Sequence, residues 1–175
     1  MSLPVWHEEA ISKAHDRDTF DCGDVALNSF LSRHARKSHV QGGAKTFLAV
    51  ENAGNRRILG FYSICPASIA FDRTPELVKR GLARHEVPVF RLARLAVDRT
   101  VQRCGLGGQL LLAAGRRGLL ASSEVGGVAL LIDAKNEDIA RWYAGYGAVP
   151  LLDQQLCLLL PFKTVYQALV AAGKL

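Results

Sequence analysis

The sequence reads RLARLAVDRTVQRCGLGGQLLL from Arg91 to Leu112, which predicts a strand, a glycine-rich loop and a helix in direct succession. The strand is rich in leucine, alanine and valine and ends at Asp98. Glycines at 105, 107 and 108 allow the backbone to approach a ligand closely and turn several N–H groups outward. The positive end of the helix dipole adds to these groups, so the loop is a candidate cradle for a pyrophosphate.

The loop differs from two other phosphate-binding loops. A Walker A motif would need Gly-Lys-Ser/Thr at its end, and a Rossmann fingerprint would need a glycine where the chain has Leu110. Arg103 would add a positive charge to the predicted cradle. A plain strand-to-helix turn is the alternative interpretation of these glycines.

Hydrophobic periodicity along the rest of the chain predicts a mixture of helices and strands. The expected helices are residues 24–37, a short helix opening at Thr74-Pro75-Glu76, residues 106–122, residues 136–146 and a short C-terminal helix. The expected strands are residues 46–51, 57–70, 87–98, 128–133 and 154–160. This order predicts an α+β fold, an α/β sandwich with a mixed sheet and helices on both of its faces. At 175 residues, the chain is expected to form a single domain over residues 1–175.

A second informative stretch follows the strand at 128–133. It begins with Asn136, continues into a helix that contains Trp142 and Tyr143, and ends at Gly147. An aromatic residue in such a helix is usually part of the core, and this is one interpretation of Tyr143. The other interpretation, a functional tyrosine, gains weight because the glycine loop precedes it in the same chain.

Together, the two stretches resemble the GCN5-related N-acetyltransferase (GNAT) family. The family's acetyl-CoA pyrophosphate loop is similar to Gln102-x-x-Gly105-x-Gly107, and its C-terminal Phe-Tyr-x-x-x-Gly-Phe segment is similar to Trp142-Tyr143-x-x-x-Gly147. The resemblance covers nearly the whole chain. It implies a mostly antiparallel central sheet with splayed central strands, and acetyl-CoA as the cosubstrate without a metal.

The resemblance also implies roles for individual residues. Tyr143 would replace the tyrosine that protonates the departing thiolate, and the backbone N–H of about Val97 would polarise the acetyl carbonyl. Two positions depart from the family pattern: Trp142 replaces a phenylalanine and Ala148 replaces an aromatic residue. The residues expected to bind acetyl-CoA are Leu95, Ala96, Val97, Gln102, Arg103, Cys104, Gly105, Leu106, Gly107, Gly108, Asn136, Ile139 and Tyr143.

Three further segments resemble the GNAT toxins of bacterial toxin–antitoxin pairs. They are Phe20-Asp21-Cys22-Gly23, Ala26-Leu27-Asn28-x-Phe30-Leu31 and Arg94-Leu95-Ala96-Val97-Asp98. The resemblance implies an enzyme that acetylates the α-amino group of aminoacyl-tRNA and stops translation, with a ribbon-helix-helix antitoxin as partner and a homodimer as assembly. No acidic residue stands out as a general base. This favours an α-amine over a lysine, because an α-amino group has a pKa near 8 and is partly neutral at pH 7.

Positive charge is concentrated in the middle of the chain. The net charge is +6, and residues 33–117 alone hold sixteen basic and five acidic side chains. A surface for a polyanion such as tRNA is one interpretation. A solvated face, or ion pairs of the arginines with Asp98, Glu86 and Glu76, is the other. The candidate tRNA contacts are Arg33, Arg36, Lys37, Arg84, Arg91 and Arg94.

The composition excludes several classes of protein. Hydrophobic residues make up 49% and charged residues 22%, which is typical of a globular protein and not of a disordered one. The apolar runs are far shorter than the ~20 residues of a membrane span, and the first residues lack the pattern of a signal peptide. We therefore expect a cytoplasmic protein. The cysteines (Cys22, Cys65, Cys104 and Cys157) and the histidines show no metal-binding spacing, which favours buried or incidental thiols.

Two other functions remain open from the sequence. One is a GNAT enzyme that acetylates a small amine or a protein amino group. The other is a non-catalytic acetyl-CoA-binding or protein-interaction module, which would keep the glycine loop but have no use for Tyr143.

Overall fold

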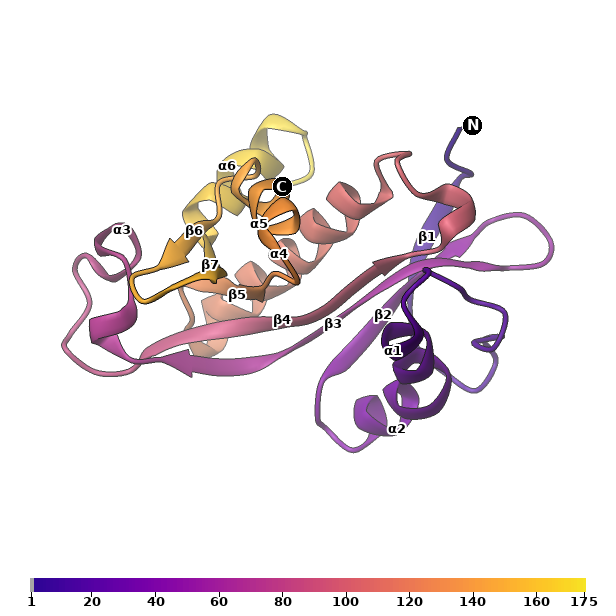
Figure 1. Cartoon of the computed structure of the whole chain (residues 1–175), viewed down its shortest axis with the longest axis horizontal. Coiled ribbons are helices and arrows are strands. Elements are labelled where there is room, and N and C mark those ends of the chain that lie inside the picture. Colours follow the sequence, from indigo (N-terminus) through magenta and orange to yellow (C-terminus); the bar gives the residue numbers. More distant parts are fainter. Residues whose placement is uncertain (1) are drawn as a thin grey trace. The chain divides into compact units, whose positions relative to one another are not determined.

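The computed structural model describes residues 2–175 and contains one seven-stranded sheet with the strand order β1-β2-β3-β4-β5-β7-β6 (Figure 1). The strands are β1 (Trp6–Ala10), β2 (Lys45–Glu51), β3 (Ile58–Ile69), β4 (Val87–Val97), β5 (Ala129–Asp133), β6 (Val149–Leu151) and β7 (Gln154–Pro161). The helices are α1 (Val25–Ser29), α2 (Ala35–Val40), α3 (Glu76–Lys79), α4 (Leu106–Val125), α5 (Glu137–Ala144) and α6 (Phe162–Ala171). A π-helical turn, η1 (Phe30–His34), joins α1 to α2, and two short 3₁₀ turns are η2 (Phe71–Arg73) and η3 (Arg99–Val101).

The predicted α+β fold with a mostly antiparallel sheet is confirmed. The pairs β1–β2, β2–β3, β5–β7 and β6–β7 are antiparallel, whereas β4 and β5 are parallel. Every helix and strand expected from the periodicity is present, with ends that differ by a few residues.

Two strands, β1 and β6, were not predicted. The β1 sequence WHEEA carries no β-branched residue, and its register with β2, from Trp6 opposite Glu51 to Ala10 opposite Phe47, places it in the sheet. Strand β6 has three residues with Pro150 at its centre, and it is held by pairing with β7. Both strands exist because a longer neighbour provides their hydrogen bonds.

Contacts within the chain define two compact units. The first unit extends to Cys65 and includes Ala93–Leu111, and the second consists of Pro66–Leu92 and Leu112–Leu175. Strands β3 and β4 and helix α4 contribute residues to both units.

In the first unit, the helical segment from α1 to α2 packs on β2 and β3. Its start is set by Asp24, whose carboxylate accepts hydrogen bonds from the N–H groups of Ala26 and Leu27, as expected for an N-cap. Leu31 and Ala35 are completely buried in the core below it. The predicted helix at 24–37 is therefore confirmed, and it continues to Val40.

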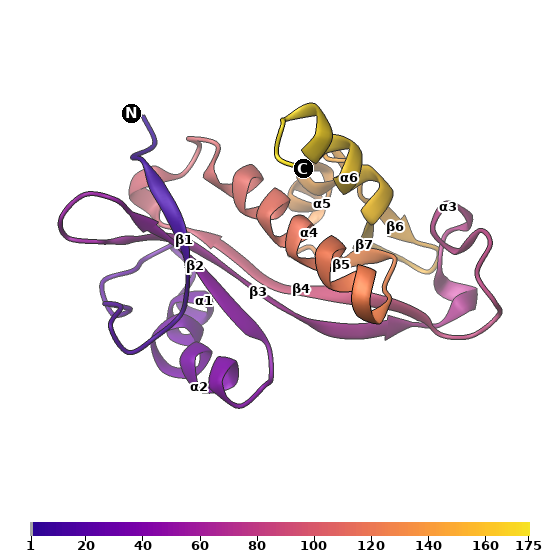
Figure 2. The same ribbon diagram turned by 180° about the vertical axis from the view of Figure 1, so that it is seen from behind.

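In the second unit, α4 and α6 lie side by side over a sheet in which Ala129–Ile132 are buried (Figure 2). The two helices approach closely at two glycines. A Cβ atom on Gly115 would come within 2.9 Å of Val165, and one on Gly118 within 2.8 Å of Phe162. These glycines therefore set the distance at which α6 packs on α4.

Within the first unit, the carboxylate of Glu9 connects strand β1 to neighbouring segments. It accepts hydrogen bonds from Arg56 Nη2 and bonds to the Nε2 atoms of His15 and His7. The hydrogen bond from Arg56 is the main cause that lowers the pKa of Glu9 to about 2.

We expect this carboxylate to make the stability of the protein depend on pH. A carboxylate with a lowered pKa in the folded state stabilises that state above its unfolded pKa, about 4.5, and loses this effect as pH falls toward 2. In urea unfolding, wild type should exceed Glu9→Gln in stability at pH 7, and the difference should shrink between pH 5 and pH 2. A difference that stays constant over this range would contradict the assignment.

Candidate active site

The end of β4 presents backbone that the sheet leaves partly unpaired. The parallel ladder with β5 runs from Phe90 to Leu92, and β4 continues beyond it to Val97. Ala96 is buried, whereas Leu95 and Val97 are half-buried. The predicted binding strand, Leu95–Val97, thus lies outside the β4–β5 ladder, where its backbone groups on that side can bind a ligand.

A buried carboxylate shapes the passage from β4 into the loop. Asp98 is 5% exposed, and it accepts hydrogen bonds from the backbone N–H and the hydroxyl of Thr100 and from the backbone N–H of Asp21. The loop then turns sharply, because Arg103 and Gly105 have φ angles of 62° and 90°. Only glycine adopts this region without strain, which explains why position 105 is a glycine.

The first turn of α4 provides unpaired backbone donors. The first hydrogen bond inside the helix runs from Gln109 N to Gly105 O at 3.3 Å. The N–H groups of Leu106, Gly107 and Gly108 precede that bond and have no carbonyl partner within the helix. Because Leu106 is buried and anchors the turn, these donors are held in place, and the predicted cradle fits a pyrophosphate.

The side chain of Gln102 holds the loop in place. Its amide nitrogen donates to the carbonyl oxygens of Cys22 and Val97, both at 2.9 Å. The amide therefore ties the loop to the end of β4 and to the N-terminal segment. Cys104, also expected to line the cofactor, bonds through its thiol to the carbonyl of Gln102 at 3.5 Å.

The N-terminal motif is the other half of this hydrogen-bond network. Asn28 donates from its amide nitrogen to Asp21 Oδ1 and accepts from the backbone N–H of Cys22, both at 2.9 Å. Asp21 also pairs with Arg99, at 3.0 Å, and its pKa is lowered mainly by the N–H of Gly23. The residues that resembled the toxin subgroup thus hold the loop and β4 together. The sequence motif contains Asp21 and Asn28, but only the structure shows that these side chains hold the loop and β4 together.

The six candidate tRNA contacts are in different environments. Arg84 forms an ion pair with Asp72, and Arg91 forms one with Asp133. These two arginines are therefore ion-paired, but their partners are not the expected Asp98, Glu86 or Glu76. The guanidinium of Arg94 lies 3.6 Å above the ring of Phe30, and its burial lowers its pKa. The remaining three lie on the first helical segment: Arg33 and Lys37 are exposed and Arg36 is half-buried.

Tyr143 is a buried residue of α5 in the second unit. Its side chain is 7% exposed, and the Trp142 ring meets its ring edge-on at 4.9 Å between centroids. Burial raises the pKa of Tyr143 to about 12, so the phenol stays protonated at neutral pH. The helix ends close to Gly147, which has a φ of 101° and where a Cβ atom would come within 2.7 Å of the Thr164 side chain, so the position favours glycine.

Two other predicted cofactor residues belong to the same helix. Asn136 is the N-cap of α5, and its side-chain oxygen accepts from the N–H of Ile139 at 2.9 Å. Ile139 is 40% exposed. The first unit therefore brings together Leu95–Val97 and Gln102–Gly108, while Asn136, Ile139 and Tyr143 lie together in the second.

Within residues 2–175, no group of His, Cys, Asp or Glu side chains could hold a metal ion. No helix in this part of the chain is both long and apolar enough to cross a membrane.

Comparison with known proteins relates the chain to bacterial toxins. No protein-family model matches it. It is 35% identical over 136 residues to a tRNA-acetylating toxin of Mycobacterium tuberculosis, covering 78% of this chain and 80% of that protein. It is 26% identical over 159 residues to the probable toxin TacT of Sinorhizobium fredii, covering 86% of this chain and 87% of that protein.

Solved structures of related toxins share the fold. AtaT complexed with acetyl-methionyl-tRNAfMet has a TM-score of 0.87 at 27% identity and covers 94% of this chain and 99% of its own. A mutant of AtaT bound to acetyl-CoA and to the C-terminus of the antitoxin AtaR has a TM-score of 0.78 at 28% identity, covering 93% and 97% of the two chains. The chain therefore belongs to the tRNA-acetylating toxins of the GNAT family.

Proposed function

We propose that this protein is an acetyl-CoA-dependent N-acetyltransferase that acetylates the α-amino group of aminoacyl-tRNA and thereby blocks translation. The observation that carries the proposal is the backbone cradle at the start of α4, held next to the free end of β4 in a chain 35% identical to a tRNA-acetylating toxin. Acetyl-CoA supplies the activated acetyl thioester.

The first unit would bind the donor through its backbone. The N–H groups of Leu106, Gly107 and Gly108 would hold the pyrophosphate, with the charge of Arg103 nearby. The N–H of Val97 would donate to the thioester oxygen and stabilise the negative charge that develops on it. The hydrogen bond from Gln102 to the carbonyl of Val97 keeps this strand end in place.

Tyr143 would complete the proton transfer. The amine nitrogen bonds to the acetyl carbon, the carbon–sulfur bond breaks, and the surplus proton of the amine must reach the sulfur. A phenol with a pKa of about 12 is a weak acid for a thiolate, since a thiol has a reference pKa of about 8.5. The phenol therefore gives its proton to sulfur only as it regains one from the amine, and acts as a relay.

The partners follow from this activity. Aminoacyl-tRNA is the acceptor, and a small antitoxin would neutralise the enzyme, as in the AtaT complexes with AtaR. Aminoacyl-tRNA is consumed in the cytoplasm, so we place the protein there. The ribbon-helix-helix fold of that antitoxin and the homodimer stay predictions.

Acetylation of bulk charged tRNA tests the activity directly. With radiolabelled acetyl-CoA, we expect label in tRNA that is released by mild alkaline deacylation, because the acetyl group is then on the esterified amino acid. Label found only in protein or in small amines would contradict this proposal and would indicate a GNAT enzyme that acetylates another class of amine.

Gly107→Glu tests the cradle. A carboxylate in the first turn of α4 would face the pyrophosphate, and such like-charge contacts cost several kcal/mol, so affinity should fall by about 100-fold or more. Calorimetric titration with acetyl-CoA measures the effect. The matched control is Gly54→Glu in the β2–β3 turn, where a Cβ atom meets open space. Equal affinity in the two variants would refute the cofactor assignment.

Tyr143→Phe tests the proton relay. Removing the hydroxyl should lower kcat by about 10²-fold or more while acetyl-CoA affinity is kept, because the group acts only in the transfer step. Tyr146→Phe, which changes a 46% exposed tyrosine of the same segment, should leave turnover unchanged. If Tyr146→Phe lost turnover and Tyr143→Phe kept it, the proton-transfer role would belong to Tyr146, one helical turn further on.

A further inference from the structure

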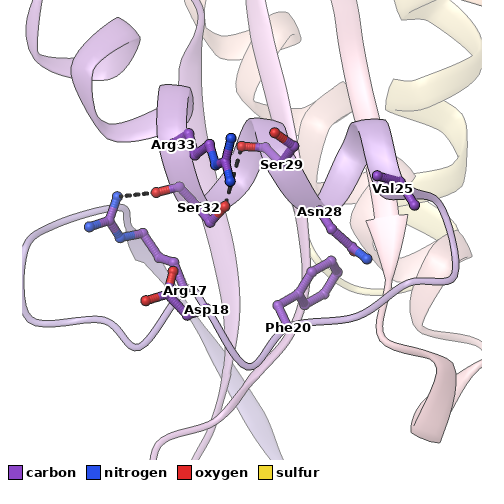
Figure 3. Close-up of a pocket in the computed structure, with 8 residues that line it drawn as sticks. All are labelled: Arg17, Asp18, Phe20, Val25, Asn28, Ser29, Ser32 and Arg33. Carbon is purple, nitrogen blue, oxygen red and sulfur yellow. Dashed lines mark hydrogen bonds between the residues drawn. The ribbon is translucent and has the colours of Figure 1, made fainter.

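A pocket of about 310 Å³ lies in the first unit, and none of its lining residues belongs to the predicted acetyl-CoA loop (Figure 3). It is formed by the segment before α1 and by the helical segment from α1 to η1. Its lining residues are Arg17, Asp18, Phe20, Val25, Asn28, Ser29, Ser32 and Arg33. The volume is at the lower end of the range of small-molecule sites, about 300–1,000 Å³, and suits a group of mononucleotide size.

Two arginines give the pocket its charge. Arg17 is half-buried, and its Nη1 donates to the carbonyl of Ser32 at 3.3 Å. Its Nε is completely buried and has no hydrogen-bond partner among residues 2–175. A ligand in the pocket cannot reach this buried nitrogen. The Nη groups make one hydrogen bond to the described part of the chain, that to Ser32, so their other N–H donors can pair with an anionic ligand. Arg33 adds a second, exposed guanidinium from η1.

The other walls are apolar or uncharged and polar. Phe20 is 5% exposed and belongs to the core, where its ring meets Phe61 edge-on at 5.5 Å between centroids, so it offers little surface to a ligand. The hydroxyls of Ser29 and Ser32 can bond to base edges or to ribose, whereas the amide of Asn28 is already bonded to Cys22 and Asp21. Asp18 opposes a small, highly charged anion but can accept from a base amino group or a 2′-hydroxyl.

We propose that this pocket binds one nucleotide of the single-stranded 3′ end of aminoacyl-tRNA. Its phosphate would pair with one of the two arginines, Arg17 and Arg33, and its base would lie against the guanidinium plane of the other. The inference rests on the proposed function and names the part of the RNA that this site recognises. A duplex does not enter a pocket of this size, whereas an unstacked nucleotide does.

Hydrogen bonds connect the pocket to the reactive end of β4. Asn28 lines the pocket and bonds to the N–H of Cys22, whose carbonyl accepts from Gln102, and the same amide bonds to Val97. A nucleotide held here would therefore lie against the same network that positions the strand end. This favours the aminoacylated end of the RNA over a distant part of it.

The test compares two RNA hairpins that copy a tRNA acceptor arm, one with and one without the 3′-terminal CCA. Binding is measured at one low salt concentration for wild type, Arg17→Gln and Arg33→Gln. Each variant should bind the complete hairpin about tenfold or more weakly, the scale of losing a hydrogen bond to a charged group. All three proteins should bind the truncated hairpin equally. Arg116→Gln, on the exposed side of α4, removes the same charge and should not distinguish the two hairpins.

Thermal melting and acetyl-CoA titration verify that each variant folds, and Arg33→Gln keeps the test valid if Arg17→Gln does not, because Arg33 is exposed. Equal weakening for both hairpins, or unchanged binding of the complete one, would overturn the pocket assignment. Hairpin binding is independent of turnover. A wild type that shows the CCA-dependent effect but no acetylation would therefore disprove the proposed function and leave the nucleotide site standing.

Discussion

The buried carboxylate of Asp98 is the interaction on which the predicted acetyl-CoA loop depends. A carboxylate at 5% exposure is costly unless it is hydrogen-bonded, and here Thr100 and the backbone of Asp21 supply three bonds, with Arg57 Nη1 3.9 Å from Oδ1. The same bonds fix the exit of β4 and dock the N-terminal segment on it. Gln102 adds two bonds between these parts. The glycine loop is thus held before any ligand arrives, which lowers the entropic cost of binding.

The tyrosine shows how burial selects among chemical roles. Exposed, Tyr143 would be an ordinary phenol, but burial in α5 raises its pKa to about 12 and keeps its proton in place. Such a group donates a hydrogen bond reliably and relays a proton only when one is returned. This fits an acceptor that brings its own proton, as an α-amine does once it attacks the thioester.

The distribution of charge was a weaker guide to function than the loop. Three of the six candidate arginines and lysines are engaged elsewhere: Arg84 and Arg91 in ion pairs and Arg94 on the ring of Phe30. A count of basic residues does not distinguish arginines with protein partners from arginines that can bind RNA. Arg17 lies outside the basic middle of the chain, yet it lines the pocket and makes only one hydrogen bond within residues 2–175, from Nη1 to Ser32.

The sequence by itself determined the order of elements, the glycine loop and the candidate tyrosine, because periodicity and glycine spacing express local backbone preferences and the burial of one face. Strands β1 and β6 could not be predicted, since their own residues favour strand weakly and their neighbours hold them. Only the tertiary structure decided what side chains do. Gln102 meets Cys22 across 80 positions and Asp98 meets Asp21 across 77, and no local pattern specifies such partners. The pocket around Arg17 depends in the same way on a loop packing against a helix, so it exists only once the chain has folded.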